Sequence, residues 1–439
     1  MYRRHYIKNG ETTVLYLPDS LRFFQVNELT QNIIDDVCKI DRSQVLKKYG
    51  IDKLEYDLLT QVLGKKCEVN DVPRNKLNRL TLIISGVCNL RCKYCYAHNG
   101  KYRDNSGNMS IDILKQSLDV FCSEYDEIEN IMFFGGEPLL NIDAIKNGCE
   151  YVYDKYEKGD IKSLPVLGLV TNGTIVTDEF IELVKKYNMK VTVSLDGPPI
   201  VNDRLRVYED GKGSSLLVEN NILKLKKECN QPEIIEATYT TIHEKLGMSV
   251  VDVVKYLKDK FDVPNIHISP ESSFGDDELK DASILPFVES IDEVHKMKKV
   301  GCDYRFLSYN STLEGLKNKQ ISQHYCEAGL SKFSVAPNGD VYPCHLFTGE
   351  IDVKMGNIED VNLFKSEKWC NMQKTLSNFS KYQKAGCAEC YSNTLCRQCI
   401  AENYFSNGNF FAVSKKKCEF TMSKTEKIIS NVVKEKMTK

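Results

Sequence analysis

The sequence predicts an α/β fold built around a parallel sheet. The first observation is that apolar runs alternate with amphipathic stretches between residues 80 and 270. The runs expected to be strands are Leu80–Ser85, Asn130–Phe134, Val166–Thr171, Lys190–Leu195, Ile234–Thr240 and Ile266–Ser269. The expected helices are Ile111–Tyr125, Ile142–Tyr156, Thr177–Tyr187, Ser215–Glu228 and Ser249–Phe261. The second observation is that each of the early strands leads directly into a polar or cysteine-bearing motif, as expected where chemistry collects at strand carboxyl ends.

The first 76 residues differ from this pattern. Thr12–Leu17 and Arg22–Val26 predict a hairpin, with a turn at residues 18–20. Helices are expected from Asn27 to about Cys38 and over Arg42–Tyr49 and Lys53–Leu63. Two strands and three short helices are too small for an enzyme core. They predict either a separate recognition module or a plain packing extension.

After residue 285 the strand–helix alternation breaks down and cysteines become dense, and Thr421–Lys439 has helical periodicity. The expected segments are an N-terminal module (1–76), an α/β unit (77–285), a cysteine-rich extension (286–420) and a C-terminal helix (421–439).

Composition excludes several classes of protein. The 439 residues hold 59 basic and 61 acidic side chains, so nothing indicates a nucleic-acid partner. No apolar run approaches the ~18 residues that span a bilayer, and the N-terminus lacks the apolar core of a secretory signal. Seventeen cysteines in a large chain of this kind indicate metal sites in a reducing cytoplasm rather than disulfides.

The most informative motif holds three cysteines within eight residues, Cys88, Cys92 and Cys95. Three thiolates can ligate three irons of a 4Fe–4S cluster and leave the fourth iron open to another ligand. Structural zinc also uses Cys-x-x-Cys pairs, but it needs a fourth ligand, and this is not a zinc-finger spacing.

With Tyr94 as its aromatic residue, this loop resembles that of the radical S-adenosylmethionine (SAM) enzymes, and the resemblance covers almost the whole chain. It implies a partial (β/α)6 barrel in which the open iron binds SAM. One-electron cleavage of SAM there produces a 5′-deoxyadenosyl radical that removes a hydrogen atom from a C–H bond. Gly135-Gly136-Glu137-Pro138, on its own a tight turn, resembles the family's motif for the SAM amino group. The residues that the resemblance assigns to SAM are Tyr94, Gly135, Gly136, Glu137, Pro138, Asn172, Ser194 and Arg206.

A second set of seven cysteines lies near the C-terminus: Cys326, Cys344, Cys387, Cys390, Cys396, Cys399 and Cys418. Seven thiols are too many for one metal site and nearly enough for two 4Fe–4S clusters, while two structural zincs are the alternative. The spacing resembles the SPASM extension of radical SAM peptide maturases, which holds two auxiliary clusters.

Carried over, the resemblance assigns an outer cluster to Cys387, Cys390, Cys396 and Cys418, and an inner cluster to Cys326, Cys344 and Cys399. Two features depart from the family. Only two residues separate Cys396 from Cys399 where three are usual, so the spacing alone does not fix how these two cysteines divide between the clusters. The inner cluster also lacks an obvious fourth ligand, for which Cys302 is the sole candidate. Either Cys302 supplies this ligand, or one iron of the inner cluster stays open.

These resemblances imply a cytoplasmic oxidoreductase with SAM and three 4Fe–4S clusters that modifies a ribosomally made precursor peptide. The N-terminal module, which resembles winged-helix-like leader-binding modules, would hold the peptide leader on its sheet edge. The favoured product is a thioether between a cysteine sulfur and a carbon of another residue. A carbon–carbon cross-link, or oxidation of cysteine or serine in a sulfatase-type protein, is the alternative enzyme reaction. A zinc-holding peptide-binding scaffold is the non-enzymatic one. A flavodoxin or ferredoxin is the expected electron donor.

Overall fold

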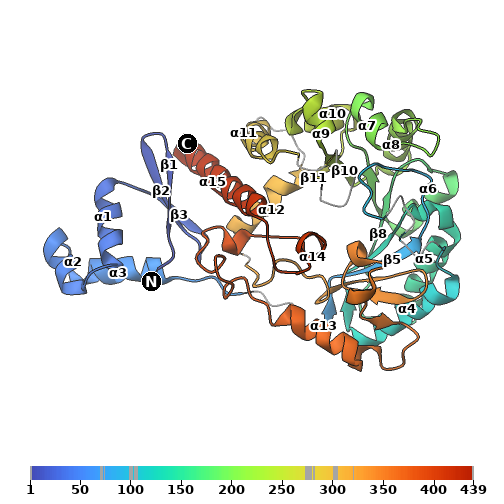
Figure 1. Cartoon of the computed structure of the whole chain (residues 1–439), viewed down its shortest axis with the longest axis horizontal. Coiled ribbons are helices and arrows are strands. Elements are labelled where there is room, and N and C mark those ends of the chain that lie inside the picture. The colour runs from blue at the N-terminus through green and yellow to red at the C-terminus, as the bar shows by residue number, and fades with distance from the viewer. Residues whose placement is uncertain are drawn as a thin grey trace.

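The structure is a computed structural model. It describes residues 2–69, 73, 75–97, 102, 107–271, 279, 282–299, 305–319 and 321–437. Figure 1 shows a small N-terminal module, a curved sheet with helices on its outer side, and C-terminal segments that lie between the two.

A ten-stranded sheet forms the centre of the molecule. Its strands in spatial order are β12 (Arg305–Phe306), β11 (Asn265–Pro270), β10 (Ile234–Tyr239), β9 (Lys190–Ser194), β8 (Val166–Thr171), β7 (Asn130–Gly135), β5 (Arg79–Ser85), β13 (Lys332–Val335), β14 (Asp340–Tyr342) and β15 (Gly356–Asn357). Neighbours from β12 to β13 are parallel, and β14 and β15 add antiparallel pairs. From β5 to β11 the six barrel strands follow chain order across the sheet, which confirms the expected partial barrel.

Helices cover the outer side of this sheet (Figure 1). Five agree closely with the expected ranges: α4 (Ile111–Glu124), α5 (Ile142–Glu157), α6 (Asp178–Tyr187), α8 (Ser215–Cys229) and α10 (Val250–Phe261). α4 and α6 begin where they do because the side chains of Ser110 and Thr177 accept hydrogen bonds from the first turn. Two short helices, α7 (Pro199–Leu205) and α9 (Thr241–Lys245), were not expected. No helix within the described ranges is long and apolar enough to cross a membrane.

β5 is buried on both faces because helices cover one side of the sheet and the barrel interior lies on the other. In β5, consecutive residues Leu82, Ile83 and Ile84 are all fully buried. A strand buried on both faces needs no alternation of polar and apolar residues, which is why the apolar run of β5 is continuous.

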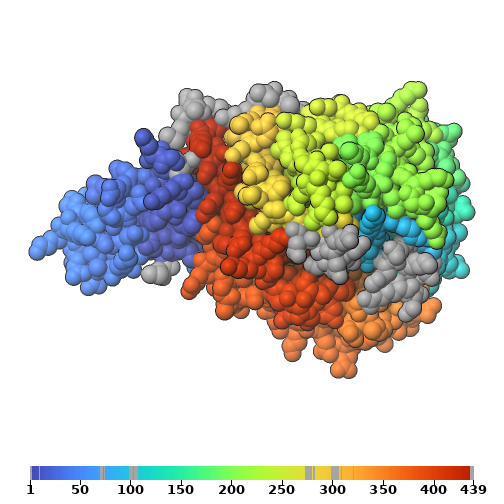
Figure 2. Space-filling view, turned by 45° about the horizontal axis from the view of Figure 1, so that its top comes forward, coloured from blue at the N-terminus to red at the C-terminus, as the bar shows by residue number. Residues whose placement is uncertain are grey.

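The N-terminal module is a three-stranded antiparallel sheet, in the order β1-β2-β3, with three helices. Its elements are β1 (His5–Asn9), β2 (Thr12–Leu17), β3 (Arg22–Val26), α1 (Glu28–Val37), α2 (Arg42–Tyr49) and α3 (Lys53–Gly64). The hairpin and helices lie where the sequence predicts them, but β1 is an additional strand. Ile7 is its one fully buried side chain among those described, so its sequence gives little hydrophobic signal. Figure 2 shows the module projecting from the main body and meeting it at the C-terminal segment.

Two expectations for the C-terminal part are wrong. The alternation continues past residue 285, because α11 (Leu285–Lys299) leads to β12 and then to α12 (Leu307–Asn318). A strand as short as β12 leaves little pattern in the sequence. The last helix, α15 (Lys415–Met437), begins before Thr421, because its first residues are lysines without apolar periodicity. Because α15 begins at Lys415, Cys418 lies in its first turn. The helix packs against α11, α12 and β1.

Candidate active site

The three-cysteine loop (residues 88–95) starts at the carboxyl end of β5 and runs beside the end of α7. Backbone hydrogen bonds hold it there: the Arg91 N–H donates to the Val207 carbonyl at 2.7 Å, and the Lys93 N–H donates to the Leu205 carbonyl at 3.0 Å. The loop is thus attached to the first barrel strand and to the segment that follows the fourth strand.

The thiols of this loop lie in a common environment. Burial raises the pKa of Cys88 to about 11 and that of Cys92 to about 12, and the neighbouring cysteine charges add to both shifts. Such thiols must lose their protons to bind metal, so cluster assembly here releases protons. The Leu90 N–H and the Asn172 side-chain amide donate to Cys88 Sγ at 3.4 and 3.6 Å. Donors of this kind stabilise a thiolate.

These thiols fit an iron–sulfur cluster better than a single ion. Within the described residues, no three Cys, His, Asp or Glu side chains converge closely enough to hold one metal ion. A 4Fe–4S cluster needs no such convergence, because each thiolate binds a separate iron at a corner of the cubane. The arrangement of Cys88, Cys92 and Cys95 is therefore compatible with the 4Fe–4S cluster that the family resemblance assigns to them.

Gly135 and Gly136 allow the end of β7 to lie against the cysteine loop. The Gly136 N–H donates to the Ser85 carbonyl at 2.8 Å, and the next N–H donates to the Val87 carbonyl at 2.9 Å. A Cβ on Gly135 would lie 2.3 Å from Ser85 O, and one on Gly136 would lie 2.3 Å from Val87 O. Both partners are backbone atoms, so neither position accepts a side chain unless the loop moves.

Glu137 is fully buried and joins two strand ends. Its carboxylate accepts hydrogen bonds from the Leu139 N–H at 3.1 Å, the Thr171 hydroxyl at 2.8 Å and the Asn172 N–H at 2.7 Å. Burial nevertheless raises the pKa of Glu137 to about 7. The residue also precedes a short 3-10 helix, η1 (Pro138–Asn141). Its structural role is to hold β8 beside β7, and its contact with the SAM amino group stays a prediction.

Asn172 links the end of β8 to the cysteine loop. Its Nδ2 donates to Asn89 Oδ1 at 2.8 Å as well as to Cys88 Sγ. Asn89 Nδ2 in turn donates to Thr174 Oγ1 at 2.8 Å, and Thr174 donates to Asn172 Oδ1 at 2.7 Å. This closed set of hydrogen bonds positions the loop, and a direct contact of Asn172 with SAM stays a prediction.

At the fourth strand end, the structure brings Tyr94 and Arg206 together through Asp196. The Tyr94 hydroxyl donates to Asp196 Oδ2 at 2.6 Å, and Arg206 Nε lies 3.1 Å from the same oxygen. The Arg206 guanidinium also lies 5.5 Å from the centre of the Tyr94 ring. Burial disfavours the charged guanidinium, but the negative charges of Asp196, Tyr94 and Cys92 together outweigh this effect, so the pKa of Arg206 is raised. Ser194, the last residue of β9, is half-buried, and its contact with SAM stays a prediction.

The outer cysteines lie around one cavity of about 280 Å³. Cys387, Cys390, Cys396 and Cys418 all line it. Burial raises the pKa of Cys418, and the other three thiols raise it further because like charges lie close together. The cavity wall also supplies contacts to sulfur, with the Tyr325 hydroxyl 3.1 Å from Cys387 Sγ.

The inner cysteines form a separate group. Burial raises the pKa of Cys344, and the charges of Cys399 and Cys326 raise it further. The structure thus places Cys396 and Cys399 in different groups of thiols, a division that the cysteine spacing alone does not fix. Cys302 lies outside the described residues.

One buried cation beside the outer cavity was not singled out in the sequence. Lys381 is fully buried, and its ammonium donates to the Cys396 carbonyl at 3.0 Å. Burial lowers the pKa of Lys381 to about 7. Lysine is normally exposed, so no local pattern would have identified this position.

The N-terminal module contacts the outer-cysteine loop directly. Arg3 donates to the carbonyls of Ala388 and Cys390 at 3.0 and 3.4 Å. The His5 ring stacks on the Tyr391 ring, with the ring centres 3.6 Å apart. His5 Nε2 lies 2.6 Å from the Oε1 atom of Glu426, which belongs to α15. We call this contact the module joint.

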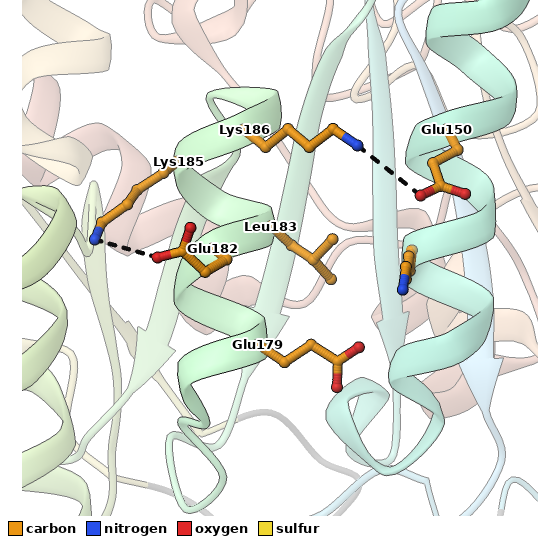
Figure 3. A pocket seen from close by; sticks show the side chains of 7 residues that line it. Glu150, Glu179, Glu182, Leu183, Lys185 and Lys186 are labelled. Atoms are coloured by element: carbon orange, nitrogen blue, oxygen red, sulfur yellow. Dashed lines mark ion pairs between the residues drawn. The ribbon is translucent and has the colours of Figure 1, made fainter.

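A hollow of about 510 Å³ between α5 and α6 lies apart from these groups (Figure 3). Four of its charged side chains form two ion pairs: Lys186 lies 4.0 Å from Glu150, and Lys185 lies 3.5 Å from Glu182. It is a charged surface groove, lined by none of the predicted site residues.

Comparison with known proteins identifies the family. The radical SAM superfamily matches residues 82–243, and the SPASM iron–sulfur cluster-binding domain matches residues 326–400. An uncharacterized protein of Methanocaldococcus jannaschii is 32% identical over 293 residues, which cover 66% of this chain and 92% of that protein.

Two named relatives cover more of the chain. The radical SAM cyclopropyl synthase TigE of Paramaledivibacter caminithermalis is 24% identical, over 91% of this chain and 86% of its own. A cysteine-type anaerobic sulfatase-maturating enzyme of Clostridium novyi is 27% identical, over 81% of this chain and 96% of its own.

Two solved structures share the fold. The anSMEcpe structure with bound AdoMet and the Cp18Cys peptide covers 83% of this chain and 99% of its own, with a TM-score of 0.65 at 20% identity. Streptococcus suis SuiB bound to precursor peptide SuiA covers 95% of this chain and 98% of its own, with a TM-score of 0.55 at 14% identity. The three-cysteine loop lies at the end of a barrel strand, and seven further cysteines follow in the C-terminal part of the chain. This chain therefore belongs to the radical SAM superfamily: it is an iron–sulfur enzyme that uses SAM and carries a SPASM domain.

Proposed function

We propose that this enzyme installs a thioether in a ribosomally made precursor peptide, joining a cysteine sulfur to a carbon of another residue. The observation that carries the peptide part is the open edge of the N-terminal sheet. Among the described residues, β3 pairs with β2 alone, while the module joint and α15 lie against β1. An extended leader can pair with such an edge, and Phe24 of β3 is 40% exposed there.

Similarity to SuiB supports this part of the proposal. The anSMEcpe match covers 83% of this chain, whereas the match to SuiB, solved with its precursor peptide, covers 95%. A leader held by the module raises the effective concentration of the peptide's reacting segment at the barrel.

The cofactors, when bound, supply a 5′-deoxyadenosyl radical that removes a hydrogen atom from the substrate. The residues proposed to contact SAM are Tyr94, Gly135, Gly136, Glu137, Pro138, Asn172, Ser194 and Arg206. Among them, Glu137 takes the amino group and Arg206 takes the carboxylate. Three 4Fe–4S clusters are proposed from the three cysteine groups. The inner group contributes Cys326, Cys344 and Cys399, and we propose that its fourth ligand position is kept for the substrate's own cysteine rather than taken by Cys302. A flavodoxin or ferredoxin is the proposed electron donor.

A second candidate is oxidation of a cysteine or serine in a sulfatase-type protein. The sulfatase-maturating relative of Clostridium novyi favours it, since this chain covers 96% of that enzyme. TigE, a cyclopropyl synthase by name, favours the carbon–carbon alternative instead. Membership of the radical SAM superfamily argues against the non-enzymatic alternative, a zinc-holding scaffold that only binds a peptide.

The products distinguish these reactions. The reconstituted enzyme would be incubated without oxygen with SAM, a reductant and the cysteine-containing peptides encoded beside its gene, and the products analysed by mass spectrometry. A thioether removes two hydrogens and leaves no cysteine for alkylation. A carbon–carbon link removes two hydrogens but leaves the thiol. Oxidation of cysteine to an aldehyde removes two hydrogens and also replaces the sulfur, released as sulfide, with an oxygen from water.

Two controls complete this experiment. The variant carrying Cys88→Ala, Cys92→Ala and Cys95→Ala should form neither product nor 5′-deoxyadenosine. Peptide without its leader should react far more slowly than the full peptide. Equal turnover of a leaderless sulfatase peptide, with sulfur lost, would contradict the proposal and support the second candidate.

A further inference from the structure

Asp196 connects several parts of the proposed SAM pocket. It is fully buried at the loop after β9. One carboxylate oxygen accepts the Tyr94 hydroxyl and faces Arg206, and the other accepts the Thr238 N–H of β10 at 2.9 Å. The carboxylate thereby joins the three-cysteine loop, the end of α7 and the fifth barrel strand.

The backbone of Asp196 is fixed as firmly as its side chain. Its N–H donates to Asn202 Oδ1 at 3.1 Å, and its carbonyl accepts His243 Nε2–H at 2.9 Å. His243 is fully buried, and its Nδ1 accepts the Thr240 N–H at 3.1 Å. Burial lowers the pKa of His243, in keeping with a neutral ring that donates from Nε2. Asp196 therefore has little freedom to move.

Arg206 depends on this fixed carboxylate. Its side chain is buried, with 8% exposure for the whole residue, and its Nε faces Asp196 without an aligned hydrogen bond. Its guanidinium also lies over the face of the Tyr94 ring. The guanidinium thus has one edge toward Asp196, while its remaining N–H donors are left for a ligand. A second carboxylate on those donors would be held in a fixed geometry.

We propose that Asp196 is a positioning residue for SAM, which holds Arg206 and Tyr94 so that Arg206 can bind the SAM carboxylate. This inference rests on the proposed placement of SAM at Arg206. The ion pair is formed before the ligand arrives, so binding costs no reorganisation of the buried arginine. Without the Asp196 charge, Arg206 would be an unpaired buried cation free to take other orientations.

The test compares Asp196→Asn with Asp203→Asn in the reconstituted protein. Asn keeps the shape of the side chain but removes its charge. Asp203, also on this segment, accepts bonds from Ser215 rather than from Arg206. Equilibrium dialysis with SAM should show binding weakened about tenfold or more in Asp196→Asn and little changed in Asp203→Asn. Iron content should stay at the wild-type value in both.

An electron paramagnetic resonance readout separates positioning from general damage. SAM should perturb the signal of the reduced cluster in wild type, and Asp196→Asn should need more SAM for the same change. If Asp196→Asn loses iron or does not fold, Tyr94→Phe, which removes a single hydrogen bond to Asp196, should still weaken SAM binding severalfold.

The outcomes are distinct. SAM affinity equal to wild type in a folded Asp196→Asn, or in Tyr94→Phe where Asp196→Asn fails to fold, overturns the inference and leaves the proposed function intact. Wild-type protein with a full complement of iron that binds no SAM would instead overturn the proposed pocket itself.

Discussion

Glu137 brings a carboxyl group into the interior, where three hydrogen bonds only partly replace its lost hydration. Burial raises its pKa from an ordinary 4.5 to about 7. Between these values the unfolded chain has released the proton while the folded chain still holds it. Stability therefore falls as pH rises from about 4.5 to about 7, and this contribution is constant above and below that window.

We expect Glu137→Gln to remove this pH-dependent contribution, which is on the order of 3 kcal/mol. Thermal unfolding without added SAM would be followed from pH 5 to pH 8. Wild type should lose stability relative to the variant as pH rises, even though the variant is less stable at pH 5 through a mismatched hydrogen bond.

Glu157→Gln, at the exposed end of α5, is the matched control and should follow wild type at every pH. Parallel profiles for wild type and Glu137→Gln would show that Glu137 is ionised at neutral pH. In that case the donors from Thr171 and Asn172 would outweigh its burial.

Side-chain roles in this site were less predictable than the positions of its motifs. The cysteine spacings are local and were readable in the sequence. Asp196, by contrast, looks like a turn residue before Gly197, and its importance comes from contacts with β10 and the cysteine loop. The division of Cys396 and Cys399 between two groups likewise depends on how the chain turns, not on their spacing.

At the scale of elements, strong periodicity gave reliable predictions. Barrel strands and their long helices agree with the structure because each buries a continuous apolar run or stripe. β1, α7 and the first turn of α15 were missed for a common reason. Each is short or polar, and each is held by neighbours far away in sequence, as His5 is held by Tyr391 and α15.

Because the module joint connects β1 to residues 388–391, we expect these two segments to stabilise each other. Arg3→Gln removes the donors to the outer-cysteine loop and the ion pair with Asp19. We expect amide hydrogen exchange to become about tenfold faster in β1 and in residues 388–391, with the barrel strands unchanged. Mass spectrometry of exchanged peptides measures this directly.

Arg42→Gln provides the comparison, because Arg42 pairs with Asp57 inside the module at 2.9 Å. It should leave residues 388–391 at wild-type protection. Unchanged exchange in Arg3→Gln would mean that stacking of His5 on Tyr391 is sufficient to hold the joint.

For the whole molecule, the three cysteine groups predict its iron content. Full reconstitution should give about twelve irons per chain, and about eight when Cys88, Cys92 and Cys95 are all replaced by alanine. Replacing Cys387 and Cys390 by serine should also give about eight, because the outer group is spatially separate. Iron and labile sulfide analysis measures both.

Zinc analysis of the same samples is the necessary companion. About four irons in wild type, or zinc that disappears with Cys387 and Cys390, would remove the auxiliary clusters. The proposed cross-linking reaction would then lack its inner ligand position, while the SAM-binding cluster would be unaffected.

The sheet runs without a break from the barrel into the SPASM domain, with β13 paired to β5 from Lys332 opposite Arg79 to Val335 opposite Leu82. A chain cut before residue 326 would expose the edge of β5, an apolar strand ready to pair with other molecules and aggregate. Engineers who exchange SPASM domains between such enzymes must therefore transplant a strand of matching register. The two named domains are one unit for design.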